Sequence, residues 1–229
     1  MTSFRRARSE EQRAERRRDI LETAAAMLDE LPVAKISLNE LSRRVCLAKS
    51  NVLRYFESRE AVLLELLDAK IREWLGQLGA ELDNGIDAAA TAQQRADRLA
   101  AVLSASCAAR PVLCDLMGNQ AAVLEHNIST RVAADYKRAA IEHVQVLARH
   151  MRTYVPEFGE HDAERFAAAT MLLVGATWTH SRPAPAMRMV YEEHPELAVL
   201  RIEFADVLRQ LLEVLASGLL SRQGPSTIR

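Results

Sequence analysis

Residues 37–56 read SLNELSRRVCLAKSNVLRYF, and this stretch decides the fold. It opens with Ser37-Leu-Asn-Glu40, a capping-box pattern in which the serine accepts from the third helical amide and the glutamate reaches back. A short helix follows, and after Cys46 a second short helix is expected to run to about Phe56. A longer apolar periodicity over residues 20–31 precedes both. Two short helices joined by a tight turn behind a longer helix are typical of a helix-turn-helix.

The outward face of the second short helix is polar. In a helix-turn-helix this helix enters the major groove of DNA. Arginine and lysine reach guanine edges, asparagine pairs with adenine, and serine and tyrosine hold phosphates. The alternative is an ordinary solvated face on a small surface helix. With their polar neighbours, these side chains form the candidate DNA-contact set: Ser37, Arg43, Arg44, Lys49, Ser50, Asn51, Arg54, Tyr55 and Arg59.

Charge is distributed unevenly along the chain. The whole chain has 30 Lys and Arg against 31 Asp and Glu, a net charge of -1 that by itself argues against a nucleic-acid partner. Residues 1–60, however, carry 13 basic and 10 acidic residues, a net charge of +3, and seven of the basic residues lie in residues 5–18. We expect this arginine-rich arm to contact phosphates or the minor groove, the alternative being a solubilising tail.

The remainder of the chain predicts helices. Aromatic residues make up only 5% of the composition, whereas alanine and leucine dominate, and prolines are widely spaced. The expected fold is all-α, with about nine helices. A three-helix helix-turn-helix DNA-binding domain (1–60) precedes a helical-bundle domain for ligand binding and dimerisation (61–229). Helical periodicity covers residues 60–78, 91–110, 129–155, 162–180 and 196–220.

Several classes of protein are excluded by pattern. The N-terminal residues lack the apolar core of a secretory signal, and the most apolar run, residues 167–178, is too short to span a bilayer. Three cysteines without CxxC spacing suggest neither a disulfide framework nor a zinc site, so we expect a reducing cytoplasm. No phosphate-binding glycine motif occurs. We therefore expect no cofactor, no metal, no membrane contact and no enzymatic activity.

Residues 19–28, 36–56 and 57–63 together resemble the TetR family of transcriptional regulators. The phenylalanine followed by Ser-Arg-Glu at residues 58–60 is the most specific part of the resemblance. Three positions depart from the family pattern: Cys46 replaces a common turn glycine, Ala48 a common capping serine, and Leu53 a common tyrosine that touches the DNA backbone. These departures put individual phosphate contacts in doubt, and Arg54 and Tyr55 are candidates to replace them.

The resemblance implies a homodimer that binds a near-palindromic operator and usually represses. The last two long helices, residues 162–180 and 196–220, would form the dimer interface, although the leucine stripe of the last helix could equally pack within the chain. The middle helices would enclose a pocket for a small-molecule effector. Because the candidate lining is mostly apolar, we expect the effector to be apolar as well. Candidate lining residues, each of which could be ordinary core, are Trp74, Leu78, Leu103, Cys107, Leu116, Met117, His143, Leu147, Met171 and Trp178.

Other readings stay open from sequence. A helical scaffold or interaction protein that has lost DNA binding would account for the departures at Ala48 and Leu53. A small helical enzyme is less favoured, because His143 and His150 are seven residues apart and no catalytic grouping can be assembled from local spacing. Sequence does not distinguish a repressor from an activator.

Overall fold

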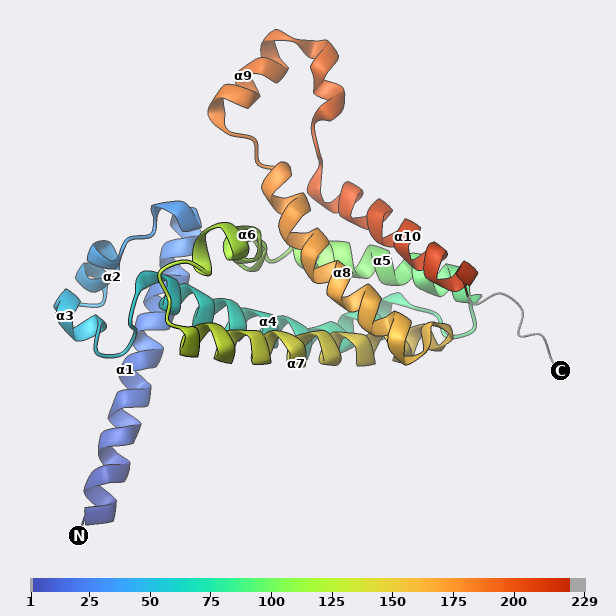
Figure 1. Ribbon diagram of the computed structural model, residues 1–229. Coiled ribbons are helices and arrows are strands. Elements are labelled where there is room, and N and C mark those ends of the chain that lie inside the picture. Colours follow the sequence, from blue (N-terminus) through green and yellow to red (C-terminus); the bar gives the residue numbers. More distant parts are fainter. Residues whose placement is uncertain (1, 223–229) are drawn as a thin grey trace. The chain divides into compact units, whose positions relative to one another are not determined.

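The computed structural model describes residues 2–222, with side chains from residue 11 onward. Within that range the chain is helical and has no strand (Figure 1). The α-helices are α1 (Thr2–Glu30), α2 (Leu38–Arg44), α3 (Lys49–Val52), α4 (Arg59–Gly85), α5 (Ala92–Ala108), α6 (Pro111–Asn119), α7 (Thr130–Tyr154), α8 (Gly159–His180), α9 (Pro185–Glu193) and α10 (Phe204–Arg222). Between them lie four short elements: the 3-10 turns η1 (Val33–Lys35), η3 (Pro156–Phe158) and η4 (Pro195–Leu200), and the π-turn η2 (Gln120–Leu124).

The chain forms two compact units. The first contains residues 1–69 and 119–137, and the second contains residues 70–118 and 138–229. In the first unit α1 contacts α2 and α2 contacts α3. This is the expected three-helix helix-turn-helix, and the all-α prediction is confirmed.

Several helix boundaries follow directly from capping residues. Thr91 forms a capping box with Gln94, whose backbone and side chain both bond to the threonine. Pro111 opens α6, where its missing N–H costs nothing. Ser58 accepts from the amide of Ala61, 3.1 Å away, at the start of α4. Local sequence chemistry therefore sets these ends.

Other boundaries differ from the prediction. The first helix begins at Thr2 rather than near residue 20, because the arginine-rich arm is itself helical. The last helix is not continuous over residues 196–220: η4 ends at Leu200, residues 201–203 are not helical, and α10 begins at Phe204. Periodic leucines on both sides of this break hid it in the sequence.

Helix α4 also runs further than expected, through Gly76 and Gly79 to Gly85. The hydroxyl of Tyr154 donates to the carbonyl of Gly79 at 3.1 Å, and a Cβ at Gly79 would lie 3.3 Å from the ring of His150. These contacts come from α7, which lies along α4 in the second unit. Packing against α7 thus sustains a helix that glycine propensity alone would weaken.

The core of the second unit is built around α10, which packs against α5 and α8 (Figure 1). The inward residues of α10 recur at helical spacing: Leu208, Leu212, Ala216 and Leu219. Part of the predicted leucine stripe therefore packs within the chain. Another part, including Leu211, stays exposed.

A test for membrane-spanning segments finds no single helix in the described range that is both long and apolar enough to cross a bilayer. One bent pair, Ala92–Ala108 with Pro111–Leu124, reaches the required length and composition only when both helices are joined across their 92° bend.

Candidate nucleic-acid interface

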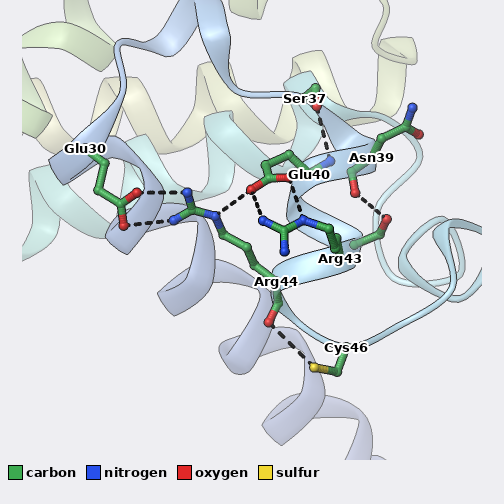
Figure 2. Close-up of polar contacts among 8 residues, drawn as sticks. Glu30, Ser37, Asn39, Glu40, Arg43, Arg44 and Cys46 are labelled. Atoms are coloured by element: carbon green, nitrogen blue, oxygen red, sulfur yellow. Dashed lines mark hydrogen bonds and ion pairs between the residues drawn. The ribbon is translucent and has the colours of Figure 1, made fainter.

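Helix α2 is capped by Ser37, whose hydroxyl oxygen accepts from the amide of Glu40 at 3.2 Å. The predicted return bond from Glu40 is not made, so the capping-box prediction is wrong in its second half. The Glu40 carboxylate bonds instead to Arg43, at 2.6 and 2.8 Å, and to Arg44 at 2.9 Å (Figure 2). Two guanidinium groups hold the carboxylate more strongly than one backbone amide would.

Arg44 joins α2 to α1. Figure 2 shows its guanidinium between Glu40 and Glu30, and both oxygens of Glu30 accept from it at 2.8 Å. This bidentate ion pair links the end of α1 to the end of α2. All three nitrogens of Arg44 bond to Glu30 or Glu40, whereas Arg43, whose side chain is more exposed, can exchange its surface ion pair for a phosphate.

The two arginines also alter the acidity of Glu40. Hydrogen bonds from Arg43 and then Arg44 lower the pKa of Glu40 from its ordinary 4.5 to about 2. The hydrogen bond from Arg44 likewise lowers the pKa of Glu30. Both carboxylates therefore stay ionised at mildly acidic pH.

This depressed pKa predicts an acid-dependent loss of stability. The contribution of Glu40 is fully present above pH 4.5, and it is lost as the pH falls from 4.5 toward about 2. In Glu40→Gln the urea midpoint should fall less over that interval than in the parent chain. Asp29→Asn, which removes an exposed carboxylate on α1, is the control. Parallel curves for the parent and Glu40→Gln would contradict the assignment.

The turn between α2 and α3 passes through Cys46, which has a φ of +54°. This left-handed conformation is where glycine is at ease and where a side chain costs about 1 kcal/mol or more. It explains why glycine is common at this position in the family that the sequence resembles. The turn holds its shape although the residue is unsuited to it.

Replacing Cys46 with glycine should therefore raise the free energy of unfolding by about 1 kcal/mol, through relief of the left-handed strain. Cys46→Ala keeps the strain and is the matched control. Urea denaturation of the two variants measures the difference. Equal stability of Cys46→Gly and Cys46→Ala would show that the turn carries no strain.

Helix α3 is shorter than predicted. It covers only Lys49–Val52, and i→i+3 bonds continue the chain to Tyr55, whose amide donates to Val52 at 2.9 Å. Its N-cap, Ala48, offers no side-chain bond, so the first-turn amides of α3 lack a side-chain acceptor from the cap. Val52 and Phe56 form the buried face of this segment.

The outward residues of this segment remain available. Within residues 11–222, no side-chain hydrogen bond or ion pair engages a group of four exposed polar residues. These are Lys49, Ser50, Asn51 and Arg54. We call them the donor face, and they have the chemistry that base edges and phosphates require.

Contacts of Arg17 that the sequence did not reveal hold the segment that carries the donor face, and we call this set of contacts the clamp. Arg17 of α1 donates to the carbonyl of Tyr55 at 2.6 Å, forms a bidentate ion pair with Glu65 of α4, and lies 4.1 Å over the ring of Phe56. This arginine was expected to contact phosphates, but it is occupied within the chain. Its partners are 38 and 48 residues away, so no local pattern signals the clamp.

The other candidate residues take up different positions. The guanidinium of Arg59 donates to the carbonyl of Ile36 at 3.0 Å and to Glu60 at 3.1 Å, so it braces the start of α4. Tyr55 is half-buried, and Ser37 is exposed but serves as a cap. In α1, Arg16 pairs with Asp19 at 3.2 Å. The side chains of Arg5, Arg6 and Arg8 lie outside the described residues.

The candidate effector-pocket residues all belong to the second unit. Every one is buried except Met171, which is half-buried. Trp74 donates to the hydroxyl of Ser106 at 2.9 Å, and Trp178 lines a cavity of about 580 Å³ beside α9. The Cys114 thiol donates to the carbonyl of Cys107 at 3.2 Å, and that thiol, together with burial, raises the pKa of Cys107. Such contacts fit a packed core as well as a pocket.

Comparison with known proteins identifies the family to which the chain belongs. Residues 68–223 match the family model described as tetracyclin repressor-like, C-terminal domain. The chain belongs to this family. The matched residues lie mainly in the second unit and follow the helix-turn-helix residues that resemble TetR regulators, so the chain is a member of the TetR-like transcriptional regulators.

Solved structures agree on the TetR-like fold. A TetR transcriptional regulator from Rhodococcus sp. RHA1 matches with a TM-score of 0.57 and 10% identity, over 93% of this chain and 98% of that one. The transcriptional regulator FadR from Bacillus subtilis, in complex with stearoyl-CoA, matches with a TM-score of 0.50 and 14% identity, over 87% of this chain and 97% of that one. No curated protein matches the sequence.

Proposed function

We propose that this TetR-like chain is a repressor that binds a near-palindromic operator as a homodimer and is released by a small-molecule effector. The donor face is the observation that carries the proposal. It combines four exposed polar side chains with a rigid support, since Arg17 and Arg44 tie the flanking segments to α1. Polar side chains held on a braced helix-turn-helix are what major-groove recognition needs.

Each donor-face residue has a role in this proposal. Arg54 and Lys49 reach guanine edges or phosphates, Asn51 pairs with adenine, and Ser50 holds a phosphate. Arg43 adds a phosphate contact at the rim. The predicted contact set has four more members, which we still propose as DNA contacts although they also stabilise the local structure: Ser37, Arg44, Tyr55 and Arg59. Their contacts within the chain hold α2, the α3 segment and the start of α4.

Dimerisation is proposed through α8 and α10. Each has large apolar side chains turned away from the chain's own core: Leu172 is 76% exposed on α8, and Val214 is 73% exposed on α10. A two-fold axis would pack these surfaces against their copies. The two donor faces would then contact successive major grooves, about 34–36 Å apart.

The effector is proposed to bind among the buried helices of residues 61–229, with residues 1–60 carrying the DNA-binding role. The lining set is mainly apolar, which favours an apolar ligand. The stearoyl-CoA bound by FadR makes a long-chain acyl-CoA the first compound to test. To release DNA, the ligand has to bind more tightly to a dimer whose two donor faces are not spaced to fit successive major grooves. The difference in binding free energy between the two forms of the dimer is typically about 1–3 kcal/mol.

A footprinting experiment on the DNA that flanks the chain's own gene tests the proposal. We expect two protected half-sites one helical turn apart, filled by two protomers. Stearoyl-CoA or another acyl-CoA that raises the melting temperature of the protein should weaken the footprint. If the folded chain protects no DNA at low salt, it is a scaffold and not a regulator.

A further inference from the structure

Exposed apolar side chains are concentrated in one part of the chain. Among residues 11–222 ten large hydrophobic side chains are exposed, and eight of them lie between residues 172 and 214. These eight are Leu172, Met187, Met189, Leu197, Val199, Leu200, Leu211 and Val214. Single exposed hydrophobic residues are normal, but a concentration of this kind marks an interaction surface.

Five of the eight lie on the segment that joins α8 to α10, residues 181–203, which we call the arm. Neither α9 nor η4 contributes a buried residue to the chain. Figure 1 shows the arm as a loop of α9 and η4 that stands away from the ends of α8 and α10. Val199, at 85%, is the most exposed large hydrophobic residue in the described range.

The base of the arm packs on α8 and α10. There the guanidinium of Arg182 lies 3.7 Å over the ring of Trp178, and Phe204 meets that ring edge-on at 5.0 Å. Above this base, the arm and the ends of α8 and α10 enclose an open hollow of about 580 Å³. Val199 and Leu200 are not among the residues that line it. Val199 and Leu200, at 85% and 65% exposed, are therefore left largely uncovered by their own protomer.

We propose that the arm packs against a second copy of this chain, as a clasp that extends the α8 and α10 dimer surface. The inference rests on the proposed dimeric function. Continuity along the chain supports it: the exposed apolar residues begin at Leu172 of α8, continue through the arm, and end at Leu211 and Val214 of α10, so the arm joins the two helices proposed for the dimer surface. A surface that adjoins the dimer helices on both sides meets the partner subunit before any other molecule.

The charges of the arm favour the same occupant. Residues 182–203 carry three arginines and four glutamates, a net charge of -1 with His194 neutral. Under two-fold symmetry, an arginine of one arm that meets a glutamate of the partner makes that ion pair twice. A net negative segment is repelled by DNA and by anionic lipid, so neither of these suits the apolar residues as a partner.

Measurement of the dimer dissociation constant tests the clasp. The variant is Val199→Ser with Leu200→Ser, and the control is Ile141→Ser, an exposed apolar residue of α7 that is 60% exposed and lies outside the arm. Sedimentation velocity of full-length chains over a range of concentrations should show the dissociation constant rise by about a hundredfold or more in the variant, because each substitution counts twice in the dimer. The control should match the parent.

The outcomes separate the two claims. If the parent is a dimer and the arm variant dissociates like the control, the clasp is wrong and the regulator proposal stands. If the parent stays monomeric while it protects its operator, both the clasp and the homodimer are wrong. Circular dichroism of the variant confirms that the helices are intact, since both substituted residues are exposed.

Chemical cross-linking gives a second, direct readout. In a Cys46→Ser background the remaining cysteines, Cys107 and Cys114, are buried, so Val199→Cys is the single accessible thiol among residues 11–222. A bismaleimide should then join two chains through their arms, whereas Ile141→Cys should give no covalent dimer. Equal cross-linking at the two positions would overturn the clasp.

Discussion

Substitution of both Lys49 and Arg54 by alanine should weaken binding to the operator by about a hundredfold or more, because each side chain contributes about 1–3 kcal/mol and a dimer presents each twice. Both residues lie on the donor face, and neither is engaged within the described part of the chain. Their removal therefore leaves the fold untouched. Fluorescence anisotropy with labelled operator measures the loss.

A control variant separates local contacts from general charge. Lys70→Ala with Arg98→Ala removes the same charge from α4 and α5, outside the helix-turn-helix. That variant should bind nearly as well as the parent. The donor-face variant should also show a shallower dependence of affinity on salt, since fewer phosphates are neutralised. Unchanged binding by the folded Lys49 and Arg54 variant would rule out α3 as the recognition element.

Gly175→Val should destabilise the chain by about 3 kcal/mol, the upper range for overpacking. A Cβ at this position would lie 2.9 Å from the carbonyl oxygen of Met117 and 3.1 Å from its carbonyl carbon. Both are backbone atoms, which cannot rotate away as a flexible side chain can. The hydroxyl of Thr179 bonds to the carbonyl of Gly118, at 3.3 Å, and so holds α6 against α8 at this crossing.

Gly76→Ala is the matched control for this prediction. Gly76 also lies within a helix of the second unit, but a Cβ there would meet nothing within 4 Å. Alanine should raise the stability by about 1 kcal/mol, through helix propensity alone. Urea denaturation compares the two variants. If Gly175→Val is as stable as the parent, α6 and α8 do not cross as closely as the structure indicates.

The fold was predictable where information is local. Ser37, Thr91 and Pro111 each mark a helix start within a few residues of sequence, and the periodic leucines mark the helices between them. The break at residues 201–203 was missed because leucine spacing continues across it. The length of α4 was missed because His150 and Tyr154, far along the chain, support its glycines.

The candidate site was predictable in its exposed part only. The donor face follows from the amphipathic pattern around Val52 and Phe56. Its support does not, because Arg17 reads as one more cation in a basic arm until the fold brings it to Tyr55 and Glu65. Arginines that hold a recognition segment and arginines that touch DNA look alike in sequence, and only their carboxylate or carbonyl partners distinguish them.

The central claim is that the donor face reads a specific operator, and one titration tests it most directly. Anisotropy of the parent chain at about 0.15 M salt compares the DNA that flanks its own gene with unrelated DNA of equal length. We expect the flanking DNA to bind about a thousandfold more tightly or better, the lower limit for specific regulators. Equal affinity for the two DNAs, or no binding to either, would contradict the account.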